Sequence, residues 1–312
     1  MLKLELAIVS ATERQHEGTI AGLACIGNQV FTAGQDKRIL SFQLPKQRSL
    51  PVSFMGLELR NAEKFVDLQA VPRMGSDFTL VASCNDSDVR IWNSGARKEA
   101  PSTLSGHVAA VTGVDAMDNF VLSSSWDQTA RVWDLHHEAE IVALPHPAGV
   151  HRALFCPLSR TIMTSCANGT LGCWDLRVSN DSPTCSMGGS TSEFSQALAT
   201  APGDLVAWPI SDSEVEIFDV PRCGSRSITS LQLSSPARSL QFLPQARVLS
   251  CGDANSKLLT MKLEDLSIQQ FDLQPGKSDR QAVTRLRCVP EDGSEMLTFL
   301  FSKHGWGYAR LT

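Results

Sequence analysis

Three polar residues, His107, Ser123 and Asp127, are of the types that a hydrolase uses as base, nucleophile and orienting acid. A second set with the same types, and with the same 16 residues between the histidine and the hydroxyl, consists of His16, Thr32 and Asp36. Neither set lies in the G-x-S-x-G motif that presents a catalytic serine. The repeated spacing favours a structural hydrogen-bond chain over catalysis, and we predict no catalytic residue.

Other chemical motifs are missing from the sequence. It has no P-loop, no H-E-x-x-H and no dinucleotide fingerprint. Its nine cysteines include no C-x-x-C pair and no Cys/His cluster at zinc-ligand spacing. Cys84 and Cys166 fall where a small buried side chain of a middle strand is expected. We therefore predict no metal, no cofactor, and free cysteines in structural positions.

The composition limits the classes of partner. The chain has 312 residues and a net charge of −5, without a run of Lys or Arg. Nucleic-acid binding needs clustered cations, so we do not expect direct binding of nucleic acid. No stretch approaches the roughly 20 apolar residues of a membrane span, and the N-terminus lacks the apolar core of a signal peptide. Free cysteines without an export signal predict a cytoplasmic and/or nuclear protein whose partners are other proteins, with no membrane contact.

A pattern recurs along the whole chain: an Asp or Asn, followed six residues later by an aromatic or apolar residue. It ends at Phe42, Trp92, Trp133, Trp174, Phe218, Met261 and Ala309. The polar residue is Asp36, Asp86, Asp127, Asn168, Asp212 and Asn255 in turn, and Lys303 takes its place in the last unit. Short alternating strands fill each unit of about 42 residues, which is typical of a radial array of four-stranded blades. Seven units account for the chain as a single all-β domain over residues 1–312.

The segment SSSWDQTARVWDL, from Ser123 to Leu135, resembles one unit of a WD40 β-propeller. The resemblance implies seven blades, each with four antiparallel strands that we letter a to d. The last unit ends after its strand c, whereas residues 2–9 read as an alternating strand that belongs to no following blade. We expect this N-terminal strand to close the last blade, as it does across the family, and to remove an exposed sheet edge.

The resemblance also implies a hydrogen-bonded tetrad of His, Ser or Thr, Asp and Trp in each complete blade. Blade 3 matches with His107, Ser123, Asp127 and Trp133, and blade 1 with His16, Thr32, Asp36 and Phe42. Blade 4 offers His146, Thr164, Asn168 and Trp174. Ala82 and Trp208 replace the hydroxyl in blades 2 and 5. We expect blades 1, 3 and 4 to be rigid and blades 5 to 7 to depend more on apolar packing.

Proteins of this family commonly bind peptides at the end of the propeller that carries the b–c turns and the d–a loops. The residue before the repeated Asp lies in the b–c turn, and the candidate partner-binding residues of this kind are Gln35, Asn85, Trp126 and Ser211. Trp126 is the strongest candidate, because a large aromatic side chain in a turn is a good interface hot spot. The alternative is that Trp126 folds onto the neighbouring blade.

We predict a non-enzymatic protein–protein interaction scaffold, a subunit of a larger intracellular assembly. One alternative rests on Trp174-Asp175-Leu176-Arg177, which is similar to the box by which some WD40 proteins dock to the adaptor of cullin-type ubiquitin ligases. Arg177 would then bind the ligase at the end of the propeller away from Trp126. A second alternative is a WD40 hydrolase, which only the resemblance in fold suggests.

Overall fold

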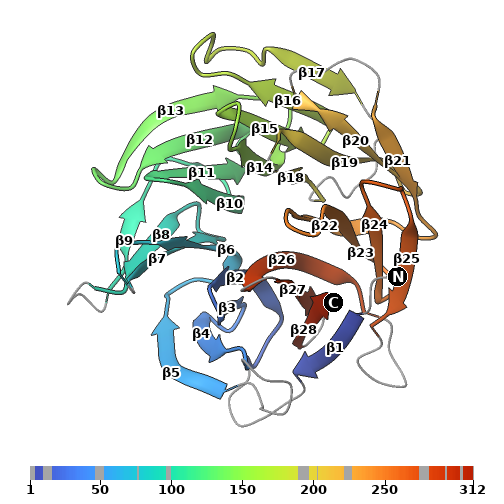
Figure 1. The fold of residues 1–312 in the computed structure, drawn as a ribbon. Helices are drawn as coiled ribbons and strands as arrows, with labels where there is room; N and C mark the ends of the chain where they lie inside the picture. Colours follow the sequence, from blue (N-terminus) through green and yellow to red (C-terminus); the bar gives the residue numbers. More distant parts are fainter. Residues whose placement is uncertain are drawn as a thin grey trace. The chain divides into compact units, whose positions relative to one another are not determined.

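The computed structural model describes residues 4–9, 16–45, 53–75, 77–95, 100–188, 197–201, 203–220, 227–273, 281–291, 294–302 and 305–311. Within these ranges the chain forms 28 β-strands, no α-helix, and seven four-stranded sheets (Figure 1). This is the all-β, seven-bladed β-propeller that the repeats predict. Lys303 lies outside the described residues.

The chain divides into two compact units, of which the first combines Met1–Phe65 with Ser235–Thr312. Blade 1 is β2 (Ile20–Ile26), β3 (Gln29–Gly34), β4 (Arg38–Gln43) and β5 (Ser53–Arg60). Blade 6 is β22 (Ala237–Leu243), β23 (Val248–Asp253), β24 (Lys257–Lys262) and β25 (Ile268–Asp272). Blade 7 is β26 (Val283–Glu291), β27 (Ser294–Phe301), β28 (Trp306–Leu311) and β1 (Leu4–Val9).

The second unit, Val66–Ser234, holds the other four blades. Blade 2 is β6 (Phe65–Pro72), β7 (Phe78–Cys84), β8 (Val89–Asn93) and β9 (Ser102–Leu104). Blade 3 is β10 (Val111–Met117), β11 (Phe120–Ser125), β12 (Thr129–Asp134) and β13 (Ala139–Pro145). Blade 4 is β14 (Val150–Cys156), β15 (Thr161–Cys166), β16 (Thr170–Trp174) and β17 (Cys185–Gly188). Blade 5 is β18 (Ala199–Ala201), β19 (Leu205–Ser211), β20 (Glu214–Asp219) and β21 (Thr229–Gln232). The single domain over residues 1–312 stays a prediction.

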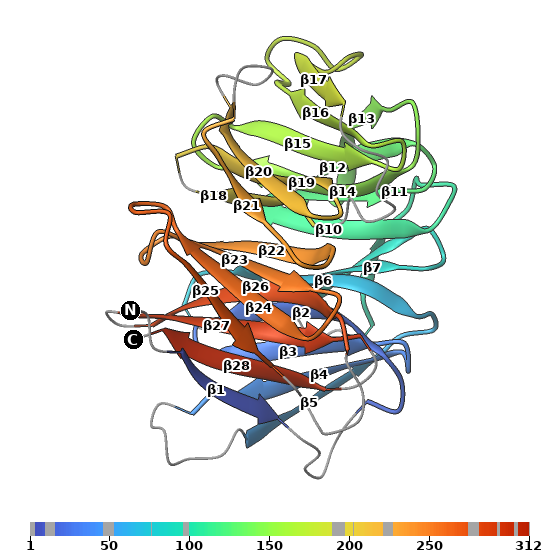
Figure 2. The ribbon, with the colours of Figure 1, turned by 90° about the vertical axis from the view of Figure 1, so that its right-hand side faces the viewer.

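The N-terminal strand closes blade 7, as the sequence predicts. β1 pairs antiparallel with β28 over six residues, from Leu4 opposite Leu311 to Val9 opposite Trp306. The two strands lie side by side in both ribbon views (Figure 2). β28 therefore has a hydrogen-bonded neighbour on each side, because β27 pairs with its other edge.

The apolar core of the second unit lies between neighbouring blades. One cluster combines Leu122 and Val132 of blade 3 with Phe155 and Ile162 of blade 4, all buried. Every residue of the middle strand β15 is buried, whereas the outer strand β13 begins with three exposed residues. This gradient arises because both faces of an inner strand are covered by adjacent blades, whereas an outer strand borders solvent.

Buried polar contacts tie the inner strands of blades 2, 3 and 4 together. Asp67 of β6 forms an ion pair with Arg152 of β14, and the side chains of both residues are almost fully buried. The same carboxylate accepts a hydrogen bond of 3.3 Å from the backbone N–H of Val114 in β10, between them. Asp115 of β10 in turn accepts the N–H of Phe155 in β14 at 2.9 Å. The partners of these two carboxylates therefore come from other blades, which ties the inner strands of blades 2, 3 and 4 to one another.

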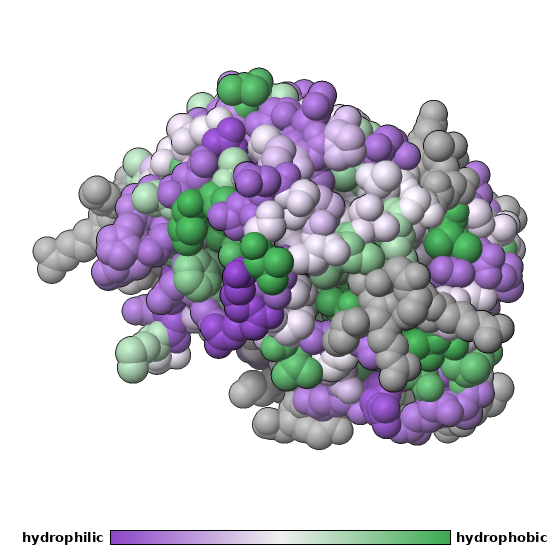
Figure 3. Space-filling view, turned by 90° about the horizontal axis from the view of Figure 1, so that it is seen from above, coloured by the Kyte–Doolittle hydropathy of each residue, from purple (hydrophilic) through white to green (hydrophobic). Residues whose placement is uncertain are grey.

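The part of the chain that the structure describes contains no helix with the length and hydrophobicity to span a bilayer. Hydrophobic residues on the face shown in Figure 3 gather in separate groups among hydrophilic ones.

Candidate functional site

The tetrad of blade 3 forms a continuous hydrogen-bond chain. His107 Nδ1 lies 2.7 Å from Asp127 Oδ2, and His107 Nε2 lies 2.7 Å from Ser123 Oγ. Trp133 Nε1 donates to the same Ser123 Oγ at 2.8 Å. Because Nδ1 faces a carboxylate, it carries the proton, and the neutral Nε2 accepts the hydroxyl hydrogen of Ser123. Ser123 thus bridges two rings and has no hydrogen left for a substrate.

Burial and charge keep this chain in one protonation state. Burial lowers the pKa of His107 below its usual value, and this effect outweighs the opposing contribution of Asp127. Burial acts to raise the pKa of Asp127, but hydrogen bonds from Thr129 and His107 outweigh it and hold that pKa below its usual value. Ser123 has no exposed surface. These hydrogen bonds connect the loop before strand a, strands b and c, and the b–c turn of one blade, which is a structural role.

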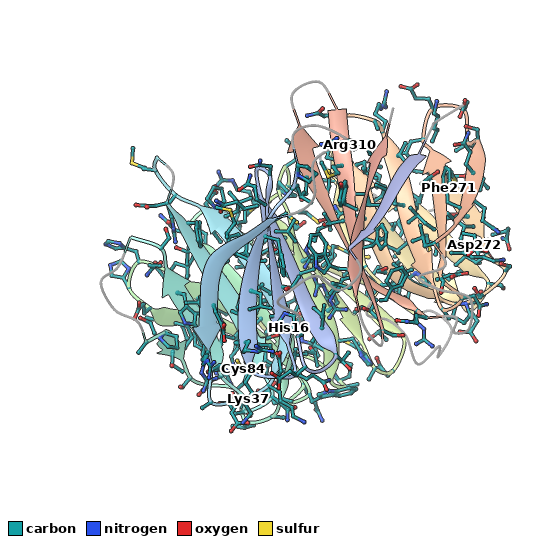
Figure 4. All side chains as sticks on the ribbon, turned by 90° about the horizontal axis from the view of Figure 1, so that it is seen from below. His16, Lys37, Cys84, Phe271, Asp272 and Arg310 are labelled. Carbon is teal, nitrogen blue, oxygen red and sulfur yellow. The ribbon has the colours of Figure 1, made fainter. Side chains whose placement is uncertain are left out.

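Blade 1 contains the same chain without its last member. His16 Nδ1 lies 2.8 Å from Asp36 Oδ1, and His16 Nε2 lies 2.9 Å from Thr32 Oγ1. Phe42, in the tryptophan position, has no N–H and instead packs against Trp306 with ring centroids 5.3 Å apart. His16 lies at the same end of blade 1 as Lys37, which follows Asp36 in the turn (Figure 4).

Blade 4 departs from the expected tetrad at Asn168. His146 Nε2 lies 2.9 Å from Thr164 Oγ1, which also accepts Trp174 Nε1 at 3.0 Å. His146 Nδ1, however, donates to the carbonyl of Leu144 at 2.8 Å, and Asn168 Oδ1 accepts from Thr170 within its own turn. The uncharged amide of Asn168 attracts the His146 ring less strongly than a carboxylate would, so Asn168 instead accepts the hydrogen bond of Thr170 within its own turn. Burial lowers the pKa of His146 to about 4.

Blade 6 contains a buried acid that the sequence pattern did not single out. Asp253, the last residue of β23, accepts the hydroxyl of Ser235 and the backbone N–H groups of Asn255 and Lys257, both at 2.8 Å. Asn255, at the repeat position, lies in the turn that Asp253 holds. The corresponding place in blade 3 is Ser125, whose hydroxyl accepts the N–H of Asp127 at 3.1 Å. The sequence feature that could have indicated this residue is an Asp two positions before the repeat position.

Trp208 of blade 5 occupies the hydroxyl position, and its buried Nε1 has no hydrogen-bond partner among the described residues. In blade 2 the repeat residue Asp86 pairs with Arg90 of the following strand β8, with Oδ1 2.8 Å from Nη1. Neither blade therefore reproduces the His–hydroxyl–Asp chain of blade 3 at these positions. The contact between Asp86 and Arg90 thus binds the turn to its own blade strand, but it does not connect the turn to the loop before strand a.

Trp126 packs against the neighbouring blade and still remains half exposed. Its ring lies against Gly149, where an added Cβ would be 2.5 Å from Trp126 Cε3. The ring meets His151 of β14 edge-on, with centroids 4.8 Å apart. The residue retains 49% of its exposure. Trp126 thus folds onto the neighbouring blade, as one of the two sequence-based alternatives states, while solvent still reaches it, and its role as a partner-binding residue stays a prediction.

Exposed apolar residues lie in the loops joined to the turn of Trp126, and we call Val108, Trp126, Pro147 and Ala167 the Trp126 surface. All four are exposed, with Val108 at 86%. The backbone joins their loops, because Trp126 N–H donates to Ala110 and Ala167 N–H donates to Gly149. The carboxylate of this region, Asp127, has only 2% of its side chain exposed and is bonded to His107. Burial also lowers the pKa of His151, so this ring is neutral at neutral pH.

The remaining predicted contact residues differ in their settings. Asn85 is exposed in the b–c turn of blade 2, and Ser211 is half-buried at the end of β19, 3.4 Å from the hydroxyl of Ser213. Gln35 is exposed in the corresponding turn of blade 1, which belongs to the other compact unit.

Arg177 lies in the c–d turn of blade 4, away from the b–c turn of the same blade. Its Nε and Nη2 contact the two carboxylate oxygens of Asp175 at 2.8 and 2.7 Å, and 69% of its side chain is exposed. These hydrogen bonds raise the pKa of Arg177 further above its usual value. The guanidinium is therefore held in a fixed position while solvent reaches it.

Most of the cysteines that the structure describes are buried within the blades. All eight described cysteines are free thiols, and Cys84, Cys166 and Cys251 are buried. Burial raises the pKa of Cys166 and raises that of Cys156 to about 12, so these thiols are protonated and unreactive. The described residues contain no group of three or more His, Cys, Asp or Glu side chains that could hold a metal ion.

Comparison with known proteins places this geometry in a family. Residues 98–134 match the family model of the WD domain, G-beta repeat. The chain is 25% identical over 167 residues to the periodic tryptophan protein 2 homolog of Dictyostelium discoideum, covering 51% of this chain and 17% of that protein. It is 27% identical over 170 residues to the serine-threonine kinase receptor-associated protein of the same organism, covering 52% and 57%.

A third relative is the ribosome biogenesis protein WDR12 homolog of Drosophila erecta, 34% identical over 97 residues, with 31% of this chain and 23% of that protein covered. The chain thus spans less than two thirds of the length of each of these relatives. The matched repeat lies on blades 2 and 3, and the same four-stranded sheet recurs seven times. The match over residues 98–134 and the seven sheets together show a seven-bladed β-propeller that carries a WD40 repeat, and they indicate no subfamily.

Proposed function

We propose that this protein is a non-enzymatic interaction scaffold that binds a partner protein through the Trp126 surface. The observation that carries the proposal is the half-exposed Trp126 ring held between Gly149 and His151. An aromatic anchor that is already fixed loses little conformational freedom when a partner covers it, so more of the contact energy appears as affinity.

The chemistry around Trp126 favours an uncharged, apolar partner side chain. The residues of the Trp126 surface carry no charge, and the nearby His151 is neutral. A charged partner residue would lose its hydration here without gaining a counter-charge, which costs affinity. We infer that the partner presents an aliphatic or proline side chain to Trp126 and Val108.

The relatives' names and the free thiols support a proposal for the cellular setting. One relative is named for ribosome biogenesis and another for association with a kinase receptor. Both names describe proteins that work with other proteins, which supports a scaffold within a larger intracellular assembly. We propose a cytoplasmic or nuclear site of action, where the cysteines stay reduced. A ribonucleoprotein assembly fits this proposal, with the direct contact at Trp126 made by protein.

Quantitative affinity purification from the native cell tests the proposal. We compare the tagged wild type with Trp126→Glu and with Ile141→Glu, a control in the same blade whose exposure of 51% matches the 49% of Trp126. We expect Trp126→Glu to lose a defined partner set by at least about tenfold, because a charge enters the anchor position, while Ile141→Glu retains it. Equal recovery with both variants, each with wild-type circular dichroism and melting temperature, would reject the proposal.

An Arg177→Ala variant in the same experiment addresses the ubiquitin-ligase alternative. Its support is the exposed guanidinium fixed by Asp175. Loss of a cullin adaptor from the Arg177→Ala sample, with full recovery in the Trp126→Glu sample, would replace the Trp126 proposal with substrate reception for a ligase.

A further inference from the structure

Two turns at one end of blade 4 expose apolar and cationic side chains together. The a–b turn, between β14 and β15, carries Leu158 and Arg160, and the c–d turn, after β16, carries Arg177 and Val178. All four are exposed, and Leu158 and Val178 each retain 72% exposure. We call these four residues the turn patch. Because successive strands are antiparallel, the turn patch lies at the opposite end of blade 4 from the b–c turn that borders Trp126.

The two turns are held to each other and to the core. Arg177 Nη2 donates to the carbonyl of Ser159 at 3.3 Å, so one side chain spans from the c–d turn to the a–b turn. Leu176 packs beneath against the cluster that contains Trp174. Arg160 N–H donates to the carbonyl of Cys156 at 2.9 Å, which closes the a–b turn. The exposed side chains therefore project from a fixed backbone.

The accessible charge of the turn patch is positive. Arg160 has no ion pair or side-chain hydrogen bond among the described residues. The two nearby carboxylates are already engaged, since Asp175 binds Arg177, and Asp204, which is 4% exposed, accepts the N–H of Ser159 at 3.1 Å. The exposed Asp181 lies farther along the c–d turn. An incoming carboxylate would thus meet the guanidinium of Arg160, whereas the guanidinium of Arg177 is already paired with Asp175 and an incoming cation would meet no free acid in the turn patch.

We propose that the turn patch is a second docking surface, which binds a partner segment with an aliphatic side chain next to an Asp or Glu. Leu158 and Val178 cover the aliphatic group, and Arg160 binds the carboxylate. Surface hydrophobic residues that occur singly need no explanation, but two of the most exposed ones beside an unpaired arginine form a composite site. This protein would then connect one partner bound at the Trp126 surface with a second partner bound at the turn patch. The inference does not depend on the Trp126 proposal.

Selection from a library of random twelve-residue peptides displayed on phage tests the inference. The library is first passed over the Leu158→Ser/Arg160→Glu variant, which removes phage that bind elsewhere on the protein. The remaining phage are then selected on the full-length wild type, so that the enriched peptides depend on the turn patch. We expect the enriched peptides to share an Asp or Glu adjacent to Leu, Ile, Val or Phe. Enrichment of peptides without an acidic residue, or no enrichment over the depleted library, overturns the inference.

Matched variants then locate the binding of a selected synthetic peptide by fluorescence anisotropy. Arg160→Glu and Leu158→Ser should each weaken binding about tenfold, the loss of a contact of roughly 1.4 kcal/mol. Arg247→Glu, which alters an arginine with a 67% exposed side chain in another blade, and Trp126→Ala should leave binding unchanged. Loss with Trp126→Ala would assign the peptide to the Trp126 surface and overturn the second site. Circular dichroism of each variant separates lost binding from lost folding.

Discussion

At the scale of single residues, His107, Ser123 and Asp127 are of the types that perform hydrolysis, but here they form a hydrogen-bond chain that stabilises blade 3. A nucleophilic serine needs a base on one side and a substrate on the other. Ser123 instead lies between His107 and Trp133, with both ring nitrogens within 2.8 Å of its Oγ and no exposed surface. The hydroxyl thus bridges two side chains inside the blade. It stabilises the fold because it provides a hydrogen-bond partner for two buried ring nitrogens, which would otherwise lose their hydration without compensation.

Removing this bridge should cost stability. Ser123→Ala leaves His107 Nε2 and Trp133 Nε1 buried without their shared partner, and we expect the free energy of unfolding to fall by about 2–4 kcal/mol. Urea denaturation followed by circular dichroism measures the change. Ser186→Ala, at an exposed position of β17, is the control and should change stability by less than about 0.5 kcal/mol. Equal midpoints for both variants would contradict the structural role.

His146 should make blade 4 sensitive to acid. Burial lowers its pKa to about 4, below the ordinary 6.5. Between these values the unfolded chain binds a proton that the folded chain excludes, so stability falls as the pH falls from about 6.5 to about 4, by up to about 1.4 kcal/mol per pH unit. His146→Gln removes this titration. The melting temperature of the wild type should therefore drop more between about pH 7 and about pH 5 than that of His146→Gln; parallel drops would show that His146 does not titrate in this window.

Residue type and spacing locate a hydrogen bond where the chemistry is local, and they do not locate it where two acceptors compete for one donor. The chain His107–Ser123 and the pair His16–Asp36 follow from residue type and spacing. The sequence pattern also placed Asn168 with His146, but an uncharged amide is satisfied by Thr170 two residues away. Asp253 escaped notice because it lies two residues before the repeat position and is paired with Ser235 from a separate segment.

At the scale of elements, the position of Trp126 is set by the loop that leads into blade 4. The sequence alone left open whether this tryptophan faces solvent or the next blade. Both occur, because Gly149 has no side chain and lets the ring lie against the backbone while half of it stays exposed. Repeat spacing can locate a turn, but it cannot show how close the neighbouring loop comes.

A methyl group at Gly149 should therefore displace Trp126. An added Cβ would lie 2.5 Å from Trp126 Cε3, so the ring must move away from blade 4. We expect Gly149→Ala to shift the Nε1–H resonance of Trp126 in NMR spectra and to reduce capture of the Trp126-dependent partners about tenfold. Gly188→Ala, where a Cβ meets nothing within 4 Å, is the matched control. An unmoved Trp126 resonance would show that the ring is not seated on Gly149.

At the scale of the whole molecule, the pairing of β1 with β28 joins segments from opposite ends of the sequence. The strand positions followed from the repeats, since each blade must alternate strands and turns to bury both faces. The closure could also be anticipated, because the last unit contained only three strands. The register of the six paired residues could not, as it depends on backbone contacts that no local pattern specifies.

Deleting residues 1–9 should destabilise the chain strongly. The deletion removes β1 and exposes the edge of β28, which then has only β27 as a neighbour. We expect a melting temperature lower by about 10 °C or more, and aggregation through the open edge. Deletion of residues 1–3, which precede β1, is the control and should have little effect. Similar melting curves for the two deletions would show that β1 adds little to the fold.

The central claim is that a partner protein contacts Trp126 directly. Site-specific photo-crosslinking in the native cell tests it, with the photoreactive amino acid benzoylphenylalanine placed at position 126 or, as a control of matched exposure, at position 141. We expect a discrete crosslinked partner from position 126 that is absent from position 141. Crosslinks of equal yield from both positions, or none from position 126, would contradict it.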